Sequence, residues 1–312
     1  MAAPSVAPAP SVVPPGSAPP PVALRGVSKA FGALLAVADL TFTLTPGTVT
    51  GFLGPNGAGK TTTLRMIGGL LRPTAGELRL FGRDAREPQA RTRLGYMPAD
   101  PVFLPHLTGR ANLDLLAHLR NPADVPDRAH ATTALGLSDA DLDRPVGGYS
   151  SGMRQKLAIV AALQHHPDLV VLDEPANRLD PIAHHAFCDL VRTAAGEGRT
   201  VLLSSHVLAE VEEVCDTVVL VREGRLLREA GVDELRRQAS RTVVMTYAVP
   251  PLHLPPSLTG LRVDGTTATG RIPARRPDLI RALLDDPNVV DLTVTPASLE
   301  DVFLDLYTGQ PP

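Results

Sequence analysis

The stretch Gly54-Pro55-Asn56-Gly57-Ala58-Gly59-Lys60-Thr61-Thr62 has the pattern G-x-x-x-x-G-K-[ST]. Loops of this pattern surround the phosphates of a nucleotide with backbone N–H groups. Their glycines allow backbone angles and a close approach that a Cβ would block. Lys60 can reach the β- and γ-phosphates, and the Thr61 hydroxyl can ligate Mg²⁺. The sequence therefore predicts that residues 54–62 bind a nucleotide.

The segments on both sides of this loop have the expected character. Residues 49–53 are typical of a short buried strand, and residues 62–67 of the opening of a helix. The N-terminus of that helix would direct its positive dipole end toward the phosphates. A strand–loop–helix setting is therefore predicted around the loop.

Two later apolar runs end in polar groups. Residues 169–172 lead into Asp173 and Glu174, and residues 201–203 lead into two serines and His206. Uninterrupted apolar runs are typical of a parallel sheet buried on both faces. Such sheets bind ligands at the carboxyl ends of their strands. The pattern predicts an α/β fold with a metal-and-water site beside the phosphate loop.

Two further stretches are candidates for nucleotide contact. Ser150, Ser151 and Gly152 stand at the start of a predicted helix, where anions bind well, although ordinary helix caps have the same composition. Phe31 lies in a polar setting and could stack on a base, or it could be a core residue. By themselves these residues leave both interpretations open.

The chain pattern predicts three parts: a tail of residues 1–21 rich in Ala and Pro, a large domain over 22–235 and a smaller one over 236–312. The tail is either inert or a proline-rich docking segment. In the large domain we expect an edge strand at 22–25, strands at 76–82 and 94–98, a helix over 108–120 capped by Thr108, and short helical pieces over 121–147. The small domain should be α+β, with strands at 242–247, 261–266 and 289–294 and helices at 277–284 and 298–304.

Composition limits the function classes. The chain has 312 residues and a formal net charge of −3, so it lacks the overall basic charge of a nucleic-acid binder. Cys188 and Cys215 form no CxxC pair, so their spacing indicates neither a zinc site nor a redox motif, and we expect two buried reduced thiols. No run of about eighteen apolar residues and no secretory signal is present, so we expect a cytoplasmic protein.

Taken in order, these stretches resemble the ATP-binding subunit of ABC transporters over residues 23–233. The resemblance is greatest to single-domain ATPases that partner a separate permease in exporters of the drug-resistance, or ABC-2, type. It implies a P-loop NTPase fold with a mixed sheet core, an N-terminal antiparallel β part and a helical subdomain at about 100–165. It also implies a small C-terminal α+β domain.

The resemblance also implies a role for each motif. Phe31 would stack on adenine, residues 54–62 would be the Walker A loop, and residues 149–153 the signature stretch. Asp173 would hold Mg²⁺ with Thr61, while Glu174 would polarise the attacking water. The implied catalytic residues are Lys60, Glu174 and His206, and the implied nucleotide contacts are Phe31, Gly54, Pro55, Asn56, Gly57, Ala58, Gly59, Lys60, Thr61, Thr62, Ser150, Ser151, Gly152 and the D-loop residue Asp180.

In this family two copies, or two similar ATPase subunits, pack head to tail around two ATP molecules with Mg²⁺. The resemblance thus implies a homodimer or such a pair on the inner face of the cell membrane, driving a separate permease, with export as the expected direction. The helical insertion, about residues 101–148, would convey the opening of the dimer after hydrolysis to the permease, with residues 103–108 as the contact. No nucleic acid partner is expected.

Three positions depart from the family pattern. Residues 149–153 keep the first Ser and second Gly of the usual LSGGQ, Ala99 stands where the Q-loop glutamine is expected, and Arg178 replaces a small D-loop residue. Asp100 could substitute at the metal position. Two alternatives stay open: an ABC ATPase acting on ribosomes or DNA, and a nucleotide-gated scaffold without hydrolysis. The C-terminal domain would stabilise the dimer or regulate it, or else sense a ligand.

Overall fold

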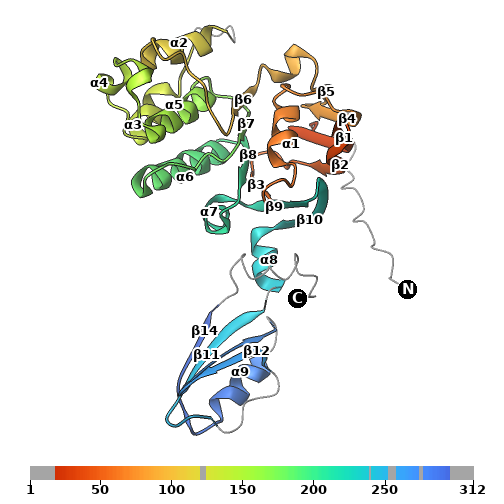
Figure 1. Cartoon of the computed structure of the whole chain (residues 1–312), viewed down its shortest axis with the longest axis vertical. Helices are drawn as coiled ribbons and strands as arrows, with labels where there is room; N and C mark the ends of the chain where they lie inside the picture. The colour runs from red at the N-terminus through yellow and green to blue at the C-terminus, as the bar shows by residue number, and fades with distance from the viewer. Residues whose placement is uncertain (1–17, 120–123, 239, 252–257, 274–276, 296–312) are drawn as a thin grey trace. The chain divides into compact units, whose positions relative to one another are not determined.

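The computed structural model describes residues 18–119, 124–238, 240–251, 258–273 and 277–295 (Figure 1). The chain divides into two compact units between Glu229 and Ala230, and each is described by itself. Of the predicted elements, the tail up to residue 17 and the helix at 298–304 lie outside the described residues. Among the helices that are described, none is both long and apolar enough to cross a membrane.

A six-stranded sheet forms the centre of the first unit, and it confirms the predicted α/β architecture. β3 pairs in parallel with β8 and β9, and β7 pairs in parallel with β8 and β6. Every residue of β3, β7 and β8 is buried, as their apolar sequences predict. In order across the sheet, the strands are β10 (Arg225–Gly231), β9 (Thr217–Arg222), β3 (Val49–Leu53), β8 (Thr200–Ser205), β7 (Leu169–Leu172) and β6 (Leu94–Met97).

Helices connect the parallel strands, as crossovers of this kind require. α1 (Lys60–Ile67) follows β3, α6 (Pro181–Gly196) lies between β7 and β8, and α7 (Leu208–Val214) lies between β8 and β9. This connectivity brings the ends of β3, β7 and β8 to one edge of the sheet. The polar residues that follow these strands are therefore neighbours.

An antiparallel sheet forms the N-terminal part of this unit, with the order β2-β1-β4-β5. The strand predicted at residues 22–25 is real but much longer, and its assignment to an edge was wrong. It pairs with β2 on one side and β4 on the other, because later segments supply strands for both of its sides. The strands are β1 (Val22–Phe31), β2 (Leu34–Thr43), β4 (Ala75–Leu80) and β5 (Arg83–Asp84).

The segment between β6 and β7 is helical, as predicted, and its helices lie together beyond the β6 side of the six-stranded sheet (Figure 1). Thr108 caps α2, because its side chain accepts a hydrogen bond from the Ala111 N–H. The helices are the 3₁₀ turn η2 (Val146–Gly148) and the α-helices α2 (Gly109–His118), α3 (Arg128–Ala134), α4 (Asp139–Leu142) and α5 (Ser151–Leu163). A further 3₁₀ turn, η1 (Pro88–Arg91), precedes β6.

The second unit has an antiparallel sheet of its own, in the order β12-β13-β11-β14. The strand predicted at 261–266 is present as β12, which ends at Asp264 and pairs antiparallel with β13. Val243, Met245 and Ile272 are buried in a separate apolar cluster, to which Leu283 of α9 contributes. The elements after β10 are α8 (Val232–Gln238), β11 (Arg241–Tyr247), β12 (Thr259–Asp264), β13 (Thr267–Ile272), α9 (Pro277–Leu284) and β14 (Val289–Thr295).

Candidate nucleotide-binding site

The predicted phosphate loop joins β3 to α1, as its strand–loop–helix pattern requires. Gly59 precedes the helix with a φ of 93°, a left-handed conformation that favours glycine. At Gly54 a Cβ would lie only 2.4 Å from the Val221 carbonyl oxygen. Both glycines are therefore required by the backbone path. The first turn of α1 thus begins at Lys60, with its N–H groups at the loop.

Lys60 is nearly enclosed, with 7% of its surface exposed. Its ammonium donates to the Gly54 carbonyl oxygen at 2.7 Å and lies 3.7 Å from Glu174 Oε1. This places a cation between the loop and the carboxylates that follow β7. A phosphate entering the loop would exchange these contacts for stronger ones with its own oxygens.

Asp173 is fully buried directly after β7. Its Oδ1 accepts hydrogen bonds from Ser204 Oγ at 2.7 Å and from Thr61 Oγ1 at 3.3 Å. Burial raises the pKa of this carboxyl, and the Ser204 hydrogen bond opposes that rise. In the described part of the chain, the other oxygen, Oδ2, has no hydrogen-bond partner. A buried carboxylate oxygen without a donor, beside a threonine hydroxyl, fits a Mg²⁺ ion, which prefers oxygen ligands.

Glu174 occupies an unusual backbone conformation with a φ of 51°. Its amide donates to Ser204 Oγ at 2.9 Å, and its Oε2 lies 2.7 Å from His206 Nδ1. Left-handed non-glycine residues carry strain and persist where surrounding contacts hold them. Here those contacts direct the carboxylate toward both Lys60 and His206. The structure therefore brings Lys60, Thr61, Asp173, Glu174 and His206 into one cluster.

The signature stretch lies at the start of α5. The Ser150 side chain caps this helix by accepting from the Met153 N–H at 3.1 Å. A Cβ on Gly152 would lie 2.9 Å from the Arg178 carbonyl oxygen, so this helix start packs against residues 177–180. Within the described residues, no hydrogen bond or ion pair joins Ser150, Ser151 or Gly152 to residues 54–62.

Asp180 links the start of α6 to the signature helix α5. Its carboxylate caps α6 by accepting from the Ala183 N–H at 2.8 Å, and it lies 3.3 Å from Lys156 Nζ on α5. The Ala183 amide holds the pKa of Asp180 below its ordinary value. The cap is therefore present at neutral pH and is lost only as the pH falls through that lowered pKa.

Phe31 ends β1 and is 47% exposed, with Lys29 Nζ 5.0 Å from its ring centre. The structure thus places it outside the core, which removes the core interpretation. An exposed ring remains free to stack on a planar group. Its contact with a base stays a prediction.

One departing position, Arg178, lies beside Asp100, the residue next to the departing Ala99. Arg178 has a φ of 70°, and its guanidinium lies 3.1 Å from Asp100 Oδ1. An acidic side chain after the Q-loop position is thus paired with the unusual arginine of residues 177–180. The pair joins the segment after β6 to the segment after β7.

The sequence-based site prediction missed two polar residues. Ser204 holds both Asp173 and the Glu174 amide, and the pair of hydroxyls that ends β8 was the available signal. Gln155 is fully buried on α5 and donates to the carbonyl oxygens of Glu174 and Pro175 at 3.1 and 2.9 Å. Gln155 stands between Arg154 and Lys156 in the sequence, so the local pattern did not mark it as buried.

Comparisons with known proteins agree with this site. The ABC transporter family model matches residues 37–177. Nod factor export ATP-binding protein I of Burkholderia lata is 36% identical, over 93% of this chain and 97% of that protein. Bacitracin transport ATP-binding protein BcrA of Bacillus licheniformis is 37% identical, over 68% of this chain and 70% of that protein.

Solved structures show the same fold. An ATP-binding subunit of an ABC transporter aligns with a TM-score of 0.64 and 30% identity, over 70% of this chain and 92% of that one. A dimeric ATP-binding cassette in a post-hydrolysis state, with ADP and Pi, aligns with a TM-score of 0.61 and 23% identity, over 68% of this chain and 98% of that one. These findings confirm the resemblance that the order of motifs predicted. The chain therefore belongs to the ABC transporter family, as an ATP-binding subunit with ATPase function among relatives of export type.

Proposed function

We propose that two copies of this chain pack head to tail around two ATP molecules with Mg²⁺ and drive a separate membrane permease. The pair works on the inner face of the cell membrane and moves a cargo outward. A second, similar ATPase subunit could replace one copy. The permease, which is a separate chain, selects the cargo.

One observation carries the pairing. Lys60, Thr61, Asp173, Glu174 and His206 converge, whereas Ser150 to Gly152 have no described contact with this cluster. A second copy can bring its own helix start to the open side of the phosphates. The Ser150 hydroxyl and the first N–H groups of α5 are suitable donors for a γ-phosphate. Each ATP then joins two chains.

The cluster divides the chemistry among its residues. Thr61 and Asp173 hold Mg²⁺, which neutralises charge on the phosphate oxygens when it is bound. Glu174 orients and polarises the attacking water, with its carboxylate held between Lys60 and His206. His206 also contacts the γ-phosphate. Positioning and charge neutralisation supply most of the catalysis in phosphoryl transfer.

The remaining predicted contacts complete the site. Phe31 stacks on adenine from the exposed end of β1, and Asp180 approaches the nucleotide of the partner. Residues 22–235 act as the ATPase domain. Residues 236–312 act as an accessory domain that stabilises or regulates the pair.

We place the permease contact at residues 103–108, in the loop before α2. Leu104 in this loop has 43% of its surface exposed, and the neighbouring Val102 has 90%. Exposed apolar groups at a loop are suited to a protein partner. Nod factor export and bacitracin transport are the roles that two relatives carry in their names, and they support export as the direction here.

The decisive experiment replaces Glu174 by Gln. We expect the variant to bind ATP normally, to lose about 10²- to 10⁴-fold in turnover, and to accumulate a dimer in ATP, because it lacks the group that polarises water. Phosphate release, calorimetry and size-exclusion chromatography measure these three properties. Glu87→Gln, a change on the exposed loop before η1, is the matched control.

Two outcomes would contradict different parts of the proposal. Normal turnover in Glu174→Gln would remove Glu174 from its role. Loss of turnover with ATP bound to a protein that stays monomeric would leave that role intact and reject the head-to-tail pair.

A further inference from the structure

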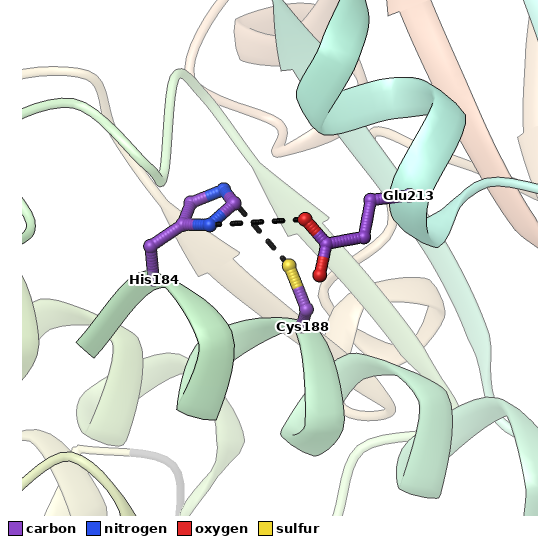
Figure 2. A group of neighbouring side chains, drawn as sticks. All are labelled: His184, Cys188 and Glu213. Atoms are coloured by element: carbon purple, nitrogen blue, oxygen red, sulfur yellow. Dashed lines mark hydrogen bonds and ion pairs between the residues drawn. The ribbon is translucent and has the colours of Figure 1, made fainter. Parts of the chain in front are cut away.

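A second cluster of potential ligands lies between α6 and α7. His184 and Cys188 project from α6 toward Glu213 of α7 (Figure 2). One donor atom from each of the three residues lies within 4.8 Å of the others. None of the three belongs to the nucleotide cluster described above.

The local structure explains why these side chains meet. His184 and Cys188 are four residues apart on one helix, so they share a face and lie one turn from each other. Cys188 is buried with 1% of its surface exposed, and His184 is half-buried. α7 packs against that face and adds Glu213 (Figure 2), whose side chain is 35% exposed. The result is a sulfur, a nitrogen and an oxygen donor at the rim of the core.

The distances between the donor atoms of the three side chains are long for hydrogen bonds between them. Cys188 Sγ lies 3.9 Å from His184 Nε2, and His184 Nδ1 lies 4.0 Å from Glu213 Oε2. Bond lengths of about 2.0–2.3 Å in a tetrahedral zinc site separate the donor atoms by roughly 3.4–3.6 Å. The two contacts use different ring nitrogens, but one nitrogen, the sulfur and one carboxylate oxygen lie within 4.8 Å of one another. The donors therefore stand somewhat farther apart than one shared ion would hold them, and binding would draw them together.

The two oxygens of Glu213 have separate surroundings. Oε1 faces Arg192 Nη2 at 3.8 Å and His185 Nδ1 at 3.5 Å, whereas Oε2 faces His184. Arg192 also donates to the Glu213 carbonyl oxygen at 2.6 Å. Carboxylate ligands of metals are commonly oriented by such partners on their other oxygen. Arg192 and His185 thus orient Glu213 with Oε2 toward the other two donors.

We propose that His184, Cys188 and Glu213 bind a divalent transition-metal ion of the zinc type. Thiolate, imidazole and carboxylate form a donor set suited to Zn²⁺ and Co²⁺, and three protein ligands leave the fourth position to water. The thiolate is the metal-binding form of cysteine, so binding at Cys188 releases the thiol proton.

The site has a consequence for the ATPase. α6 begins directly after residues 177–180, and α7 begins shortly after His206. An ion held between the two helices ties together the elements that carry the Asp180 cap and the histidine next to Glu174. Binding itself does not depend on the proposed pairing, because all three ligands belong to one chain.

The test titrates Co²⁺ into full-length protein stripped of metals by chelation. We expect a thiolate-to-cobalt charge-transfer absorption that saturates at one ion per chain and disappears on addition of Zn²⁺. Cys188→Ala abolishes the absorption, whereas Cys215→Ala, the matched change of the other buried cysteine, retains it. His184→Gln and Glu213→Gln each weaken Co²⁺ binding at least about tenfold.

Thermal unfolding adds a readout independent of absorption. A metal that binds only the folded state raises Tm with concentration, so Zn²⁺ should raise Tm in the wild type and Cys215→Ala and leave it unchanged in Cys188→Ala. The proposal is overturned if the wild type shows no thiolate absorption with excess Co²⁺. It is equally overturned if Cys188→Ala retains the absorption or if both cysteine variants lose it.

Discussion

Single residues set the geometry of the acid pair, which is formed by the adjacent Asp173 and Glu174. Glu174 adopts a left-handed φ of 51°, and Ser204 accepts the Glu174 amide while donating to Asp173. One hydroxyl thus ties the carboxylate assigned to Mg²⁺ to the backbone of Glu174, the residue assigned to water. Strain at Glu174 is tolerated because this hydrogen bond and the contacts of its carboxylate compensate for it.

Replacing Ser204 by Ala tests this arrangement. The change leaves the Glu174 amide without its acceptor, and an unsatisfied buried donor costs about 1–3 kcal/mol. We expect lower stability in chemical denaturation and a turnover reduced about tenfold, with ATP affinity preserved.

Ser205→Ala is the matched control for that change. Ser205 is also buried at the end of β8, but its hydroxyl contacts Glu210 and the Val207 backbone instead of the acid pair. Equal loss of turnover in both variants would mean that general weakening of β8 explains the effect.

At the scale of elements, the start of α5 and residues 177–180 act as one surface. Gly152 lies against the Arg178 carbonyl, Lys156 reaches Asp180, and Gln155 holds the carbonyls of Glu174 and Pro175. Direct contacts therefore join the signature helix to the segment that follows Glu174.

Replacing Gly152 by Ala should separate these two elements. Its Cβ would stand 2.9 Å from backbone, so one element must move, and overpacking of this kind costs about 1–3 kcal/mol. We expect a reduced free energy of unfolding and reduced turnover, measured by denaturant titration and phosphate release.

Gly148→Ala supplies the comparison, because a Cβ at that position meets nothing within 4 Å. Its stability should change by less than about 0.5 kcal/mol. A Gly152→Ala protein as stable and active as Gly148→Ala would contradict the close packing of these elements.

At the scale of the whole molecule, the chain has two units with separate apolar clusters. Val243, Met245, Tyr247 and their neighbours form the cluster of the second unit, whereas the first unit is built around its central sheet. Separate cores allow the two units to unfold at different free energies.

Met245→Ala tests this independence. Deleting a fully buried side chain of this size costs about 2–5 kcal/mol, and the loss should be confined to the second unit. Hydrogen exchange should quicken at β11 and β13 and stay unchanged at β3 and β7.

Val263→Ala, on the exposed side of β12 in the same sheet, should change neither region. Faster exchange of β3 in Met245→Ala would show instead that the two units unfold together. Such a result would remove the basis for treating residues 236–312 as a separate domain.

The local sequence predicted most of the nucleotide site, since its motifs are short and contiguous. Glycine spacing, Lys60 and the buried runs ending in Asp173 and His206 each depend on neighbours in the chain. The long-range pairing of β1 could not be predicted in this way. Its two neighbours are later segments of the chain, and Val22 pairs with the distant Leu80, so an interior strand was mistaken for an edge.

The family, the phosphate loop and the chemical groups around it could be read from the amino-acid sequence, because backbone requirements and residue types are local properties. Which of these groups meet depends on tertiary packing. Ser204 joins the acid pair, Arg178 meets Asp100, and Glu213 reaches His184 and Cys188 because packing brings together separate strands, loops and helices. Side-chain convergence depends on long-range packing, which spacing along the chain does not encode.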